Sequence, residues 1–129
     1  MAEELRARLR ADLRAAMKAR NILETQALRC LIAAIDNAEA VPPDLESTRN
    51  RLATGGSPWV ATGAFFGAAE VPRRVLSRSE LMALLRDEVE KRVAAAHEMD
   101  RCARPEQAEH ARNEMRIVER YVAQLAGQQ

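Results

Sequence analysis

Two long stretches of this chain repeat apolar residues every three or four positions, and a segment rich in proline and glycine separates them. That segment, residues 40–77, holds four of the five prolines and four of the five glycines. Apolar spacing of three and four is typical of amphipathic helices, which proline and glycine interrupt. Aromatic residues make up only 3% of the chain, which also favours helices over strands. The sequence therefore predicts an all-α protein.

The first periodic stretch predicts a hairpin of two helices, over residues 3–20 and 22–39. Asn21 interrupts the periodicity between them. It either ends the first helix in a left-handed conformation or caps the second, where Glu24 follows three residues later. The apolar residues at helical spacing form the predicted core: Leu5, Leu9, Leu13, Met17, Leu28, Leu31, Ile32 and Ile35.

The second stretch predicts another hairpin, with helices over residues 77–102 and 105–126. Ser77 and Glu80 have the spacing of a capping box, and Pro105 suits the first turn of the last helix. The apolar positions of this hairpin are Leu81, Leu84, Leu85, Val89, Val93, Ala96, Met99, Met115, Val118, Val122 and Leu125. Two hairpins predict one domain over residues 1–129, a four-helix bundle joined by a long loop rich in proline and glycine.

The predicted loop, residues 40–76, carries most of the aromatic side chains. We expect a short helix over residues 44–52 and extended chain over residues 59–66. Trp59, Phe65 and Phe66 are three of the four aromatic residues and lie outside the helical periodicity. They are candidate partner-binding residues, because aromatic side chains often dominate the energetics of interfaces. Alternatively, they fold back as a lid over the core of the bundle.

The charges of the chain are nearly balanced, with 20 basic and 19 acidic residues, so an electropositive site has to be local. Arg6, Arg10, Arg14 and Lys18 recur every four residues beside the first apolar row. They predict a basic ridge that binds the phosphates of RNA. Alternatively, their stems cover the edge of the core with the charged heads in water, or they pair with acidic residues of the third helix.

Motifs for catalysis, metals or cofactors do not emerge from the sequence. Cys30 and Cys102 lack the spacing of a zinc or redox motif, and His97 and His110 lie on different predicted helices. In the third helix, acidic residues precede basic ones by four positions, which indicates pairs that support the helix itself. The charged start and the lack of an apolar run of ~20 residues predict a cytoplasmic protein without a membrane span.

Several sequence patterns resemble the GatB/YqeY family of proteins related to transfer-RNA amidotransferases. They are LR.DL..AMKA, ALR.LIAAI.NAE and L...E....L..EV..R..AA.E..R, followed by ERYV.QL, and they cover residues 5–40 and 76–125. The resemblance implies an all-α amino-terminal domain, shared with the carboxyl-terminal region of the GatB subunit of glutamine-dependent transfer-RNA amidotransferases. Family members continue from YLP.QL into a tail domain, whereas this sequence has Ala123 at the proline position and stops at Gln129. The resemblance therefore implies the helical domain only.

Three functions from different classes follow. The resemblance implies a non-catalytic accessory module that binds transfer RNA or a protein of the amidotransferase machinery, because the catalytic centre of that enzyme lies in another part. The second is a helical bundle for protein interaction with no RNA role. The third is an independent enzyme, for which the sequence offers no nucleophile motif or phosphate-binding loop.

Overall fold

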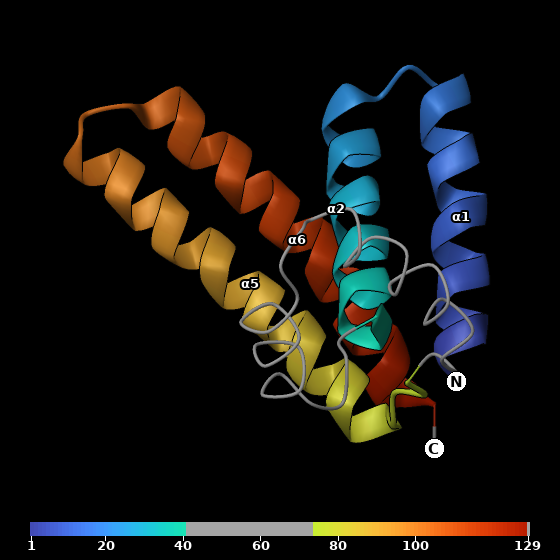
Figure 1. Cartoon of the computed structure of the whole chain (residues 1–129). Coiled ribbons are helices and arrows are strands. Elements are labelled where there is room, and N and C mark those ends of the chain that lie inside the picture. Colours follow the sequence, from blue (N-terminus) through green and yellow to red (C-terminus); the bar gives the residue numbers. More distant parts are fainter. Residues whose placement is uncertain (41–73, 129) are drawn as a thin grey trace, which may run out of the picture.

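The computed structural model describes residues 1–40 and 74–128 of the chain. Within these residues it contains four helices and no strand: α1 (Ala2–Lys18), α2 (Ile22–Ala40), α5 (Arg78–Arg101) and α6 (Pro105–Gly127) (Figure 1). For these residues the prediction of an all-helical structure is confirmed, and each helix lies close to its predicted range. The expected helix at 44–52, the extended chain at 59–66 and the aromatic residues Trp59, Phe65 and Phe66 lie outside the described residues.

The four helices form two antiparallel hairpins, α1–α2 and α5–α6, that pack against each other (Figure 1). Helix α2 contacts both α5 and α6, so it is the main link between the hairpins. The hairpins lie together near the two termini and diverge toward their turns (Figure 1). The α1–α2 turn is therefore set apart from the α5–α6 turn, and each has a surface of its own.

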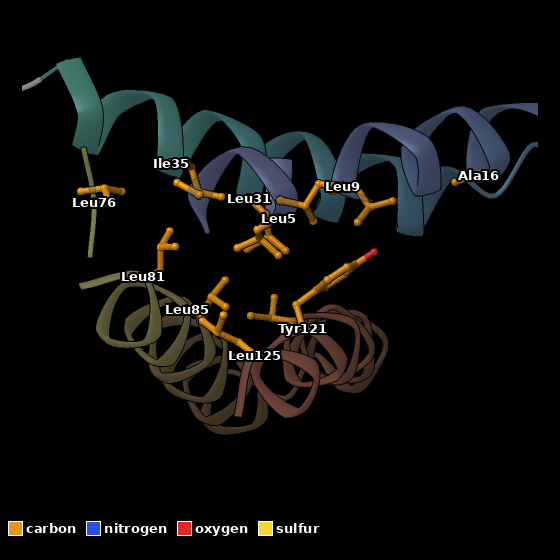
Figure 2. Close-up of a cluster of buried hydrophobic side chains, with 13 residues drawn as sticks. Leu5, Leu9, Ala16, Leu31, Ile35, Leu76, Leu81, Leu85, Tyr121 and Leu125 are labelled. Atoms are coloured by element: carbon orange, nitrogen blue, oxygen red, sulfur yellow. The ribbon is translucent and has the colours of Figure 1, made fainter. Parts of the chain in front are cut away.

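The hydrophobic core lies between the two hairpins. Figure 2 shows side chains of α1 and α2 on one side meeting those of α5 and α6 on the other. Burying one Leu, Ile or Val side chain stabilises the fold by about 1.5–3 kcal/mol. The central side chains, each almost inaccessible to solvent, are Leu9, Leu28, Leu31, Ile35, Leu81, Leu85, Val118 and Tyr121. All but Tyr121 belong to the predicted apolar rows.

The predicted apolar row of α1 is only partly correct, because it leaves the core along the helix. Leu5 and Leu9 are buried, Leu13 is half-buried, and Met17 is 50% exposed. An α-helix has 3.6 residues per turn, so each step of four residues rotates the side chain by about 40° past a full turn. After three steps the row has rotated out of the interface. Ala16, which is 4% exposed, takes the buried position instead.

The predicted helix ends are confirmed by their hydrogen bonds. The Ser77 hydroxyl accepts a hydrogen bond from the Glu80 amide at 3.1 Å, and the Asn21 side-chain oxygen accepts one from the Glu24 amide at 3.1 Å. Asn21 therefore caps α2, and the left-handed residue between α1 and α2 is Arg20, with φ 58°. These caps supply partners for amides that a helix start leaves unpaired.

Candidate functional site

The predicted basic ridge of α1 divides into a buried part and an exposed part. Arg6 is only 3% exposed, whereas Arg10, Arg14 and Lys18 are exposed. The prediction of one exposed ridge is therefore wrong at Arg6. The cause is the same rotation of about 40° per four-residue step, which turns Arg6 toward α2 and the later members away from it.

Arg6 connects the start of α1 to the end of α2 through three carboxylates. Its Nε lies 3.2 Å from Asp36 Oδ1, Nη1 lies 2.5 Å from Glu3 Oε1, and Nη2 donates to Glu39. Glu39 is itself 6% exposed. Burial alone would lower the pKa of Arg6, but the hydrogen bond to Glu39 and the charges of the carboxylates outweigh it and raise the pKa. With its donors engaged in this way, Arg6 has a structural role and does not contribute to an exposed basic surface.

The exposed cations near the α1–α2 turn have no acidic partner among residues 1–40 and 74–128. Three of them come from α1, Arg20 lies in the turn itself, and Arg29 comes from α2, where its Nη2 lies 3.9 Å from the sulfur of Met17. The salt bridges that the structure shows involve other basic residues. We call the four that lie on the two helices the basic face: Arg10, Arg14, Lys18 and Arg29.

The acidic residues of the same half of the hairpin are engaged on another side, toward α6. The Tyr121 hydroxyl donates a hydrogen bond to Asp12, and Arg120 lies 2.7 Å from Glu24. Asp12 and Glu24 are the only acidic residues between positions 10 and 29. Because these carboxylates contact α6, neither of them forms a salt bridge with a cation of the basic face. The periodicity of the sequence does not reveal that the acidic and basic residues lie on different sides of the hairpin. It also did not identify Arg29 as a member of the basic face.

A hollow of about 430 Å³ lies beside these α6 contacts. Asp12 and Glu24 line it from the first hairpin and Arg120 and Gln124 from α6, while Ala15, Ala16 and Ala19 line the rest. Tyr121 is 1% exposed, so its ring belongs to the core. Burial raises the pKa of the Tyr121 hydroxyl above its ordinary value of 10.0, and the hydrogen bond to Asp12 raises it further. The charged groups of this hollow serve to join the two hairpins.

A second buried arginine, Arg92, lies in the α5–α6 hairpin and is 8% exposed. Its Nη1 donates to the backbone oxygen and a carboxylate oxygen of Glu88, both at 2.9 Å. Its Nε lies 3.4 Å from Glu114 on α6, which is an ionic contact without hydrogen-bond geometry. The predicted pairs in this helix, Glu88 with Arg92 and Asp87 with Lys91, are confirmed. The contact to Glu114 is additional.

Other residue types that often carry chemistry do not gather in the described part of the chain. Residues 1–40 and 74–128 contain no group of three or more His, Cys, Asp or Glu side chains that could hold a metal ion. Cys30 and Cys102 are both exposed and unpaired with each other. None of the helices α1, α2, α5 and α6 combines the length and apolar content that a membrane crossing requires.

Comparison with protein-family models, curated proteins and solved structures finds no match to this chain. The resemblance to the GatB/YqeY family accordingly stays a prediction. The basic face, whose four cations form no salt bridge among the described residues, is the feature from which a function can be argued.

Proposed function

We propose that this protein is a non-catalytic RNA-binding module that holds RNA phosphates on the basic face of the α1–α2 hairpin. The observation that carries the proposal is the arrangement of charge around the turn. Four exposed cations from two helices face solvent, while Asp12 and Glu24 are paired with α6. Such a surface attracts a polyanion because binding releases the counterions that surround the phosphates.

The spacing of the cations suits a nucleic-acid backbone. Arg10, Arg14 and Lys18 follow one another at a rise of about 6 Å per four residues. Neighbouring phosphates along one RNA strand have a comparable separation. Three of the four cations are arginines, whose planar guanidinium groups can donate two hydrogen bonds to one phosphate. The α1 side chains can therefore follow a single strand, with Arg29 contacting it from α2.

Transfer RNA is the RNA class that the GatB/YqeY resemblance favours, and an accessory role beside an amidotransferase is the context that it suggests. The arrangement of the buried charges supports a non-catalytic role. Arg6 and Arg92 are each held by carboxylates, and Tyr121 is hydrogen-bonded to Asp12. These groups stabilise helix contacts, whereas an active site needs polar groups that converge on a substrate.

Charge reversal on the basic face tests the proposal. We expect the Arg10→Glu/Arg14→Glu protein to lose transfer-RNA binding, measured by fluorescence anisotropy, while its helical circular dichroism is unchanged. For the wild type, a slope of about 0.7–0.9 per phosphate contact predicts a total salt slope near 3 for four contacts.

The matched control reverses two exposed arginines of the other hairpin, Arg86→Glu and Arg104→Glu, which changes the net charge by the same amount. We expect this control to retain most of the affinity. Equal losses in the two double variants would show that net charge alone governs binding. Full binding by the Arg10→Glu/Arg14→Glu protein, or none by the wild type at low salt, would overturn the proposal.

A further inference from the structure

Two large apolar side chains are exposed beside the basic face, at the α1–α2 turn. Met17, the penultimate residue of α1, is 50% exposed, and Ile22, the first residue of α2, is 72% exposed. Neither is needed to form the turn, whose bonds come from backbone groups and Asn21. Large apolar side chains that are exposed often mark a binding site. Because they do not bind phosphates, they indicate contact with an apolar part of the ligand.

The apolar and basic side chains share one surface. Ile22 and Arg29 are seven residues apart on α2, which places them on the same side of that helix. Met17 and Arg10 have the same relation on α1. The contact of 3.9 Å between Arg29 Nη2 and Met17 Sδ joins the two rows. The tip of the hairpin therefore carries two exposed apolar side chains beside guanidinium and ammonium groups.

We infer that this tip binds unpaired nucleotides, so that the protein prefers RNA loops or single strands to continuous duplex. The inference rests on the proposed function and specifies the form of its RNA. A duplex presents phosphates and 2′-hydroxyl groups on its surface but keeps its base faces stacked inside. An unpaired nucleotide exposes base faces, on which a guanidinium plane can stack while neighbouring cations hold the phosphates. Met17 and Ile22 can add apolar contact with the same base faces.

An anionic membrane surface also combines negative charge with an apolar layer. A helix that binds at a membrane interface usually lays a long apolar face along the surface. Here the exposed apolar surface is confined to two side chains at a turn, and the exposed positions of α1 over residues 7–15 are arginines and alanines. The small area and the row of cations favour RNA.

The experiment compares wild type with a Met17→Ala/Ile22→Ala variant. The probes are an unstructured single-stranded RNA and a blunt RNA duplex whose strands have the same length. We expect the wild type to bind the single strand about tenfold more tightly than the duplex, and the variant to lose most of that preference. Duplex affinity and the salt slope should stay unchanged, because every cation is retained. Circular dichroism checks that the variant is folded. If the double variant unfolds, the Ile22→Ala single variant is used in the same binding comparison.

The outcomes separate this inference from the proposed function. Equal affinity for both RNAs, unchanged in the variant, would overturn the preference for unpaired nucleotides and leave phosphate binding intact. Absence of binding to both RNAs at low salt would overturn the proposed function and this inference together. Vesicles that contain an anionic phospholipid form the third arm. Binding to them that depends on Ile22, without RNA binding, would identify the tip as a membrane contact and contradict the inference.

Discussion

Each hairpin contains one buried arginine, and the two differ in where their partners come from. Arg6 reaches Asp36 and Glu39, which are 30 and 33 residues away on the neighbouring helix. Arg92 donates its hydrogen bonds to Glu88, four residues earlier on its own helix, and makes only an ionic contact with α6. Arg6 therefore joins two helices through charge, whereas Arg92 mainly supports one. An ion pair within a helix follows from sequence spacing, while a pair across helices depends on how they pack.

The largest expected effect is the loss of the Arg6 cluster. Arg6→Met leaves Glu39, which is 6% exposed, without its partner in a place that water reaches poorly. Removing one member of a buried ion pair costs about 3–5 kcal/mol in unfolding free energy. Urea denaturation measures this loss. Arg10→Met is the control, since the Arg10 side chain is exposed. If both variants lose the same stability, the Arg6 cluster does not hold the hairpin together.

A smaller loss is expected for Arg92→Met, about 1–3 kcal/mol. The side chains of its partners Glu88 and Glu114 are 13% and 20% exposed, so they recover solvent more readily than Glu39 does. The same urea denaturation compares the two variants directly. A loss larger than that of Arg6→Met would reverse the comparison and show that the pairing within α5 is the stronger of the two.

The hydrogen bond from Tyr121 to Asp12 lies between the hairpins rather than within one, and it should show in alkaline solution. The folded state raises the pKa of Tyr121 above its ordinary value of 10.0, mainly through burial. The unfolded chain therefore loses this proton first, so the contribution of Tyr121 is fully present below about pH 10 and is lost as pH rises above it. We expect wild-type stability to fall more steeply than that of Tyr121→Phe above pH 10. Parallel curves in thermal unfolding would contradict the assignment.

The smallest effect on stability is expected outside the described helices. Changing Trp59, Phe65 and Phe66 together to alanine should leave the melting temperature nearly unchanged and remove binding of a partner protein, if these residues form an interface. A pull-down with wild type and the triple variant, combined with thermal melting, measures both properties. A large drop in melting temperature would support the alternative, in which the aromatic residues cover the core.

Much of the fold could be predicted because its determinants are local. Ser77 with Glu80 and Asn21 with Glu24 mark helix starts through bonds between residues three positions apart. The apolar spacing likewise identified Leu31 and Leu85, both of which are inaccessible to solvent. The exposed end of the α1 apolar row was missed, because a four-residue repeat rotates by about 40° per step and leaves the core after a few turns. Met17 was assigned to the core for that reason.

The candidate site shows the same division between local and non-local information. The sequence by itself determined four helices, their caps and a row of cations on the first helix, because these depend on neighbours within one or two turns. Only the tertiary structure decided that Arg6 is buried against Glu39, that Asp12 and Glu24 pair with α6, and that Arg29 joins the exposed cations. Those outcomes depend on where one helix lies beside another. Rotation along α1 therefore sets which cations are exposed, and packing sets which carboxylates are left to neutralise them.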